Sequence, residues 1–194
     1  LEDHISLSIV HPLMLENGWT FADGPGVIKD SLFNSDYLYQ VYLKADPNYS
    51  GPVTVPVLWD KQTNTIVNNE SAEIMRMFNT AFNNITGNYD DYYPEHLQSE
   101  IDAMNDFVYP NINNGVYKAG FSTNQAVYEK EVTKLFAALD KLEEQLANQQ
   151  FLVGNQLTEA DIRLFTTLVR FDAVYFGHFK CNIKALVDYP NLWD

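Results

Sequence analysis

The stretch that decides the fold is Val53-Thr54-Val55-Pro56-Val57-Leu58-Trp59-Asp60, followed after a polar turn by Asn69-Glu70-Ser71-Ala72-Glu73-Ile74. The first part is typical of a strand and is interrupted by one proline. Proline has no N–H and restricts the preceding residue to extended geometry. We therefore expect Val55 to turn its backbone N–H and C=O outward, where an extended ligand can pair with them as an added strand.

The same proline bears on the isomer of the Val55–Pro56 peptide bond. A proline inside a good strand pattern requires an explanation, and a cis bond at a ligand site is one. The sequence leaves both isomers open and favours the cis form.

The second part of the stretch opens a helix at a place suited to a charged ligand. Ser71 precedes the helical pattern Ile74, Met75, Phe78, so its hydroxyl and the free backbone N–H groups suit an α-carboxylate. Glu70 would then take the ligand's ammonium group. Glutathione combines these features, whereas an ordinary capping box at Ser71 is the structural alternative.

Composition narrows the class of protein. The chain has 194 residues, 46% of them hydrophobic and 14% aromatic, which is enough for sizeable cores. Twelve basic and 26 acidic residues give a net charge of −14, which disfavours nucleic acid and anionic membrane surfaces as partners. No apolar run is long enough to span a bilayer. The single cysteine, Cys181, excludes an internal disulfide and fits a reducing compartment, so we expect a cytoplasmic protein.

Periodicity divides the chain near residue 90. The first half is predicted to contain strands and helices at Ile5–Val10 (strand), Asp36–Ala45 (helix), Val53–Trp59 (strand), Thr65–Val67 (strand) and Glu70–Phe82 (helix). Residues 83–91 are rich in asparagine, lose periodicity and are predicted to be a linker.

The second half reads as helical throughout. Glu95–Asn111 and Asn124–Asn148 carry apolar stripes at helical spacing. Thr158, followed three residues later by Asp161, predicts a helix N-cap worth about 1 kcal/mol. A partial thioredoxin-like α/β domain over residues 1–90, followed by an incomplete all-α domain over residues 91–194, resembles the glutathione transferase architecture.

Longer strings sharpen the resemblance. Besides the opening stretch they are Pro12-Leu13-Met14-Leu15-Glu16-Asn17-Gly18-Trp19-Thr20-Phe21, Asn113-Asn114-Gly115-Val116-Tyr117-Lys118-Ala119-Gly120-Phe121, Leu168-Val169-Arg170-Phe171-Asp172 and His178-Phe179-Lys180-Cys181. With them the chain resembles the glutathionyl-hydroquinone reductases, a group similar to omega-class glutathione transferases. In that family a cysteine thiolate attacks the sulfur of a glutathionylated hydroquinone, and a second glutathione resolves the mixed disulfide.

The resemblance implies roles for particular residues. Tyr117 would exchange the proton at the ring carbon, and the Tyr175 hydroxyl would stabilise the thiolate, because a phenol is a hydrogen-bond donor with a pKa near 10. The glutathione site would comprise Trp19, Val53, Thr54, Val55, Glu70 and Ser71. The resemblance also implies a homodimer formed through the helical domain.

Tyr117 and Trp19 can also be explained as ordinary structural residues. Without the surrounding string, Tyr117 would be one half-buried aromatic among twelve tyrosines, and Trp19 would suit a core position equally well. One cysteine and four histidines do not make a tetrahedral metal set, so we expect no metal.

The chain departs from the family pattern in two places. The family's nucleophile lies in a Cys-Pro-Trp motif, which this sequence lacks, and Cys181 occurs in an unrelated string. We therefore expect a fragment truncated at both ends, without the first strand and helix, whose nucleophile lies upstream and which is inactive alone. Pro52 also stands where the family more usually has a basic residue.

Two alternative functions share most of these features. An omega-like thiol transferase or dehydroascorbate reductase would use the glutathione site without a proton donor at a ring carbon. A non-catalytic glutathione-transferase-like interaction module would keep only the fold.

Overall fold

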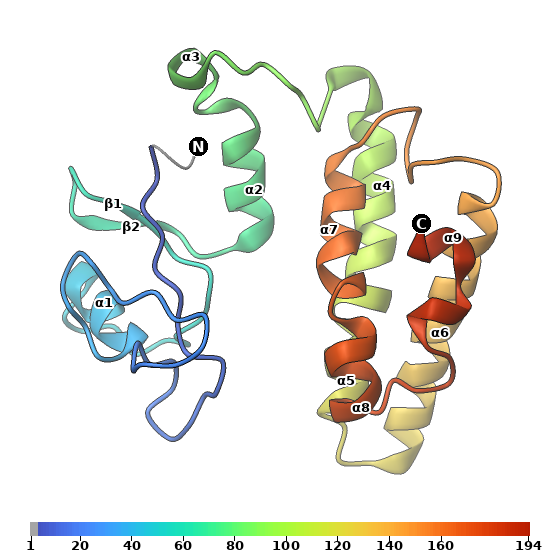
Figure 1. The fold of residues 1–194 in the computed structure, drawn as a ribbon, viewed down its shortest axis with the longest axis horizontal. Helices are drawn as coiled ribbons and strands as arrows, with labels where there is room; N and C mark the ends of the chain where they lie inside the picture. Colours follow the sequence, from blue (N-terminus) through green and yellow to red (C-terminus); the bar gives the residue numbers. More distant parts are fainter. Residues whose placement is uncertain (1–3) are drawn as a thin grey trace. The chain divides into compact units, whose positions relative to one another are not determined.

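Two separate hydrophobic cores organise the chain. The computed structural model describes residues 4–194, which fall into two units, Leu1–Tyr89 and Asp90–Asp194 (Figure 1). The start of the chain at Leu1-Glu2-Asp3, which the sequence places just before a strand, lies outside the described residues. Each unit is described by itself below.

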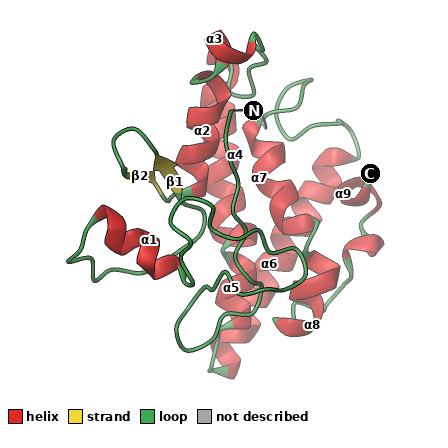
Figure 2. Ribbon diagram, turned by 60° about the vertical axis from the view of Figure 1, so that its left-hand side comes forward, coloured by secondary structure: helices red, strands yellow, loops and turns green. Residues whose placement is uncertain are grey.

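The first unit combines short helices with a small antiparallel sheet (Figure 2). Its elements are helix α1 (Leu38–Ala45), strands β1 (Leu58–Asp60) and β2 (Thr65–Asn68), and helices α2 (Ser71–Thr80) and α3 (Asn83–Thr86). In the sheet, Trp59 pairs with Ile66. The core consists of Phe21 together with Leu38, Val41 and Tyr42 from one face of α1.

The sheet is smaller than the sequence predicts. The predicted strand Ile5–Val10 is wrong, because Ile9 makes only an isolated antiparallel bridge to Ile28. Of the predicted strand Val53–Trp59 only the end is formed, in β1. Strand propensity needs a neighbouring chain to become a ladder, and Pro56 has no N–H to contribute to one.

The segment predicted as a linker also differs in part. Residues 83–86 form helix α3, although the sequence there has no apolar periodicity. The helix ends at Gly87, whose φ of 70° is in the left-handed region that favours glycine.

The second unit is all helical among the described residues. Its α-helices are α4 (Gln98–Val108), α5 (Gly115–Gly120), α6 (Gln125–Leu146), α7 (Glu159–Leu168), α8 (Phe176–His178) and α9 (Pro190–Trp193). Short 3-10 turns occur at Glu95–Leu97 and Leu186–Asp188, and π-helical turns at Tyr109–Asn113 and Phe171–Tyr175. The residues that α4, α6 and the π turns bury include Ile101, Ile112, Leu135, Leu139 and Phe171.

The helix predicted over Glu95–Asn111 is divided into three parts: a 3-10 turn, α4 and the first π turn. Pro110 lies in that π turn. Because proline cannot donate the next helical hydrogen bond, the backbone takes the wider turn before α5 begins at Gly115.

The predicted cap at Thr158 is confirmed. One oxygen of the Asp161 carboxylate accepts hydrogen bonds from the Thr158 N–H and hydroxyl, both at 2.8 Å, and the other accepts from Leu152 N–H at 2.7 Å. Thr158 is completely buried. The capping box therefore begins α7 and also fixes the loop before it.

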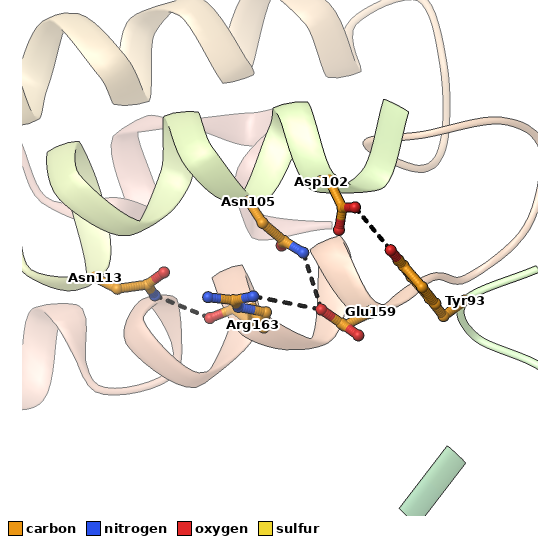
Figure 3. Close-up of polar contacts among 6 residues, drawn as sticks. All are labelled: Tyr93, Asp102, Asn105, Asn113, Glu159 and Arg163. Carbon is orange, nitrogen blue, oxygen red and sulfur yellow. Dashed lines mark hydrogen bonds and ion pairs between the residues drawn. The ribbon is translucent and has the colours of Figure 1, made fainter. Parts of the chain in front are cut away.

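Polar contacts inside the second unit join α7 to the α4 region (Figure 3). Glu159 accepts a hydrogen bond from Asn105 Nδ2 of α4 at 2.9 Å and pairs with Arg163 at 3.3 Å. Further along, Asn113 Nδ2 donates to the Arg163 carbonyl at 2.9 Å. These contacts fix the direction of α7 before the chain enters the second π turn.

Within residues 4–194, no helix is both long and apolar enough to cross a membrane.

The Thr158 cap gives a stability prediction. Thr158→Ala should lower the free energy of unfolding by about 1 to 2 kcal/mol, because it removes the capping hydroxyl from a buried helix start. Urea unfolding followed by far-UV circular dichroism measures the loss. Thr123→Ala, at an exposed loop threonine, is the matched control and should change stability by less than about 0.5 kcal/mol; equal losses in the two variants would contradict the assigned role.

Candidate functional site

In the first unit, one buried hydroxyl connects the segment before Pro56 to the segment before α2. Tyr42 Oη donates to the Thr54 carbonyl at 2.9 Å and accepts from Thr54 N–H at 3.3 Å and Asn69 Nδ2 at 3.1 Å. Asn69 Nδ2 also contacts Thr54 Oγ1 at 3.3 Å. Since Tyr42 is only 2% exposed, this hydroxyl fixes both segments from inside the unit.

The Tyr42 hydroxyl with its partners Thr54 and Asn69 is called the Tyr42 clamp below. Val55, the residue after Thr54, presents its backbone to the outside. Val55 is exposed, and the Val55–Pro56 bond is cis, the isomer that the sequence favours. Within the described residues, no backbone hydrogen bond uses the N–H or C=O of Val55. These two groups are therefore available to an extended ligand.

The start of α2 follows directly from the clamp. Glu70 is the N-cap residue and Ser71 the first helical residue, and both are exposed. Among residues 4–194, neither the Glu70 carboxylate nor the Ser71 hydroxyl makes a hydrogen bond, so the capping box considered as an alternative does not form here. The side chains and the first N–H groups of α2 remain open to an anion or a zwitterion.

Two of the predicted residues also serve the core. Trp19 and Val53 are partly buried and both pack against the core of the first unit. The Trp19 carbonyl accepts from Leu38 N–H at 2.9 Å, which anchors the start of α1. Packing and ligand contact are compatible roles for these side chains.

In the second unit, the fold brings together the two tyrosines that the sequence singles out. Tyr117 Oη and Tyr175 Oη lie 3.3 Å apart although the residues are 58 positions apart in the chain. Tyr117 is 41% exposed, whereas Tyr175 is 3% exposed. Tyr117 is therefore the member of the pair that a ligand can reach, and Tyr175 supports it from the interior.

The environment of Tyr117 favours its neutral form. Burial raises the pKa of Tyr117 to about 12, and the positive charge of Arg170 acts in the opposite direction. A phenol with such a pKa keeps its proton at neutral pH. It can therefore donate that proton to a strongly basic atom.

Aromatic packing holds the pair in place. The Phe179 ring lies 5.3 Å from the Tyr117 ring and 5.5 Å from the Tyr175 ring, measured between centroids. Gly120 makes room for it, because a Cβ at that position would lie 2.2 Å from Phe179 Cγ. Gly120 and Phe179, which lie in two of the quoted strings, are therefore sterically matched, because the Phe179 ring fits only beside a residue without a side chain.

Sequence reasoning assigned no role to three residues of these two regions, namely Tyr42, Asn69 and Arg170. Arg170 Nε donates to Tyr175 Oη at 3.1 Å. Tyr42 has the spacing of an ordinary core residue of α1, and only its hydroxyl contacts distinguish it. Asn69 and Arg170 lie inside the quoted strings, but the partners of Asn69 are distant in sequence, and the contact of Arg170 with Tyr175, five residues later, depends on the π turn between them.

Two other kinds of chemical group remain, the thiol of Cys181 and side chains that could bind a metal ion. Cys181 is completely buried, and burial raises the pKa of its thiol to about 11, so it is a poor nucleophile. Within residues 4–194, no three His, Cys, Asp or Glu side chains gather in a way that could hold a metal ion.

Comparison with known proteins agrees with both units. A family model described as "Glutathione S-transferase, C-terminal domain" matches residues 125–194. The glutathionyl-hydroquinone reductase YqjG of Escherichia coli is 59% identical over the whole chain, which covers 59% of that protein. Its glutathione-bound structure matches 96% of this chain and 61% of its own with a TM-score of 0.94.

Two further proteins extend the comparison. Glutathione transferase Xi 1 from Trametes versicolor has a structure that is 52% identical, with a TM-score of 0.95 over 99% of this chain and 68% of that one. A Schizosaccharomyces pombe protein named glutathione S-transferase omega-like 2 is 50% identical over 99% of this chain and 64% of that protein. The chain belongs to the Xi-class glutathione transferase family.

The Tyr42 clamp gives a second prediction. Tyr42→Phe should lower the free energy of unfolding by about 1 to 3 kcal/mol, because Thr54 and Asn69 lose a buried partner. Hydrogen exchange at the Thr54 amide should accelerate in the same variant. Urea unfolding followed by tryptophan fluorescence and exchange measured by nuclear magnetic resonance provide the two readouts.

Tyr49→Phe is the matched control for that experiment. The Tyr49 hydroxyl makes one exposed hydrogen bond, to the Pro52 carbonyl at 2.7 Å, so its loss should cost less than about 1 kcal/mol and leave Thr54 protected. Unchanged exchange at Thr54 in Tyr42→Phe would rule out the clamp.

Proposed function

We propose that the protein carrying this chain reduces glutathionyl-hydroquinones to hydroquinones at the expense of glutathione. The observation that carries the proposal is the tyrosine pair, in which an exposed Tyr117 hydroxyl is supported by a buried Tyr175 hydroxyl at 3.3 Å. General thiol exchange needs no such donor, because its leaving group is a thiolate. Expelling an aromatic carbon does need a proton at that carbon.

The first unit would bind the glutathionyl group. The free backbone of Val55 would pair with its extended chain, and Thr54 and Val53 would lie beside it. Ser71 and the first N–H groups of α2 would take an α-carboxylate, Glu70 an ammonium group, and Trp19 would contribute apolar surface. The structure of the Escherichia coli relative is glutathione bound, which supports this choice of ligand.

The proposed reaction has two displacement steps at sulfur, of which only the second is a thiol–disulfide exchange. A cysteine thiolate attacks the glutathione sulfur, the sulfur–carbon bond to the ring breaks, and the electron pair left on the ring carbon takes the proton of Tyr117. A second glutathione loses its thiol proton, which restores the Tyr117 hydroxyl, and its thiolate attacks the mixed disulfide, giving oxidised glutathione and the free cysteine thiolate. The buried Tyr175 hydroxyl would support the Tyr117 phenolate through the contact at 3.3 Å, and the contact with the thiolate that the resemblance implies for Tyr175 stays a prediction.

The nucleophile of this proposal is a cysteine upstream of the chain, as the resemblance implies. Cys181 does not suit the role because it is buried and its pKa is raised to about 11. The chain spans 59% of the length of the Escherichia coli relative. We further propose that the complete protein is a cytoplasmic homodimer, which sedimentation analysis and cell fractionation can test.

The omega-like relative makes a thiol transferase or dehydroascorbate reductase the alternative to be separated. That activity would use the same glutathione site but would not depend on Tyr117. A non-catalytic interaction module would show neither activity.

Tyr117→Phe separates these readings in the complete natural protein. It should lower kcat for glutathionyl-hydroquinone reduction by about 100-fold, the lower end of the usual contribution of a general acid. Exchange with a glutathione mixed disulfide should be unchanged. Both rates can be followed by chromatography of the released hydroquinone and thiol.

Tyr109→Phe is the control for that variant, since Tyr109 is exposed and has no assigned role. Equal hydroquinone release by Tyr117→Phe and the natural protein would refute the proton-donor role. The 194-residue chain and its Cys181→Ser variant should both be inactive, and activity lost only with Cys181 would show that Cys181 is the nucleophile.

A further inference from the structure

Arg170 is an exposed cation in a strongly acidic chain, yet it is turned toward a phenol. Its Nε donates to Tyr175 Oη at 3.1 Å, and within the described part of the chain it forms no ion pair with a carboxylate. The chain has 26 acidic and 12 basic residues, so a carboxylate partner would be the expected arrangement. The nearby Asp172 instead accepts from the N–H groups of Leu186 and Val187.

The backbone holds this contact. Arg170 lies just before the π turn Phe171–Tyr175, and its carbonyl accepts from the N–H groups of Val174 at 2.9 Å and Tyr175 at 3.4 Å. The Tyr175 ring is fixed on its other sides by Phe171 and Phe179, at centroid distances of 6.4 and 5.5 Å. The hydroxyl of Tyr175 therefore has a fixed position between Arg170 and Tyr117.

Each phenol hydroxyl can donate only one hydrogen bond, so the direction of each hydrogen bond decides which proton is left for a ligand. A phenol has one proton to donate and accepts through its oxygen, whereas arginine only donates. With Arg170 donating to Tyr175, the proton of Tyr175 is free to point at Tyr117 Oη. Either hydroxyl of the Tyr117–Tyr175 pair can be the donor at 3.3 Å. In the order that begins at Arg170, Tyr117 accepts from Tyr175, and its own proton is free to leave toward a ligand.

We propose that Arg170 is a positioning residue that sets the direction of the hydrogen bonds from Arg170 through Tyr175 to Tyr117, so that the Tyr117 proton is presented to the ring carbon of the departing hydroquinone. When that proton leaves, the phenolate of Tyr117 accepts the hydrogen bond of Tyr175, with the guanidinium charge behind it. This inference rests on the proposed function, because it assigns the order of donors in the same site.

The test compares Arg170→Gln and Arg170→Lys with the unchanged complete natural protein. Arg170→Gln should lower kcat for glutathionyl-hydroquinone by about tenfold, less than the loss of a direct donor, while KM stays within about twofold. Arg170→Lys should recover most of the rate because it keeps the charge and a donor. Exchange with a glutathione mixed disulfide should be the same in all three proteins.

A spectroscopic measurement on the 194-residue chain tests the inference independently of activity. With ring carbon-13 labelling of tyrosine, and Tyr117→Phe to assign the signal, Tyr117 should titrate at a higher pH in Arg170→Gln than in the natural chain or in Arg170→Lys. The Arg170 charge lowers the pKa of Tyr117, so its removal has this sign.

The possible results distinguish failure of the role proposed for Arg170 from failure of the proposed function. Loss of both reactions to the same extent in Arg170→Gln, no change in kcat, or no change in the Tyr117 titration would overturn the role of Arg170. If the unchanged complete protein releases no hydroquinone, the proposed function fails, and the titration still decides whether Arg170 controls Tyr117.

Discussion

A buried phenol has to find polar partners for its hydroxyl, and this constraint shapes both candidate regions. Tyr42 uses its hydroxyl to join Thr54 to Asn69, and Tyr175 uses its hydroxyl to join Tyr117 to Arg170. Tyr189, which is also buried, donates to Asp140 at 3.0 Å and fixes the segment before α9. In each case the ring contributes apolar burial, and the hydroxyl selects which distant segment lies beside it.

The consequence for the first unit is a candidate ligand surface made largely of backbone. A single hydroxyl fixes Thr54 on one side and Asn69 on the other. Within the described residues, Val55 has a defined position without a backbone hydrogen bond of its own, whereas Glu70 is also held by its own N–H, which donates to Asn68 Oδ1 at 2.6 Å. Pre-organised backbone loses little conformational freedom when a ligand binds. The second unit differs, because its candidate chemistry lies in side chains supported by aromatic packing around Phe179.

Much of the fold could be predicted from the sequence where periodicity and capping agree. The helices at α1, α2 and α6 and the Thr158–Asp161 box were predicted close to their observed bounds. The strand predicted at Ile5–Val10 was wrong, and of the strand predicted at Val53–Trp59 only the end is formed. Alternation records the preference of a chain for a ladder but not the presence of a partner strand. The π turns were also missed. The wider turn changes the sequence pattern very little, and Pro110 in the first π turn was the one sequence signal for it.

The residues of the candidate regions were likewise predicted only in part. Tyr117 and Tyr175 were found through a resemblance that covers their surrounding strings, and the fold places their hydroxyls together. Tyr42 and Arg170 were missed because their importance depends on a single atom: an apolar stripe predicts that Tyr42 is buried but not what its oxygen contacts. Arginine on a surface is ordinary until its neighbour is known.

The tyrosine pair and its arginine are assembled wholly within the second unit, from α5 and the turn after α7. No residue of the first unit is needed to place these three side chains relative to one another. Under the proposed function, substitutions in the helical unit could therefore alter the leaving-group chemistry while the backbone surface at Val55 stays unchanged. The substrate of such a protein could then change in evolution without loss of the site proposed for glutathione.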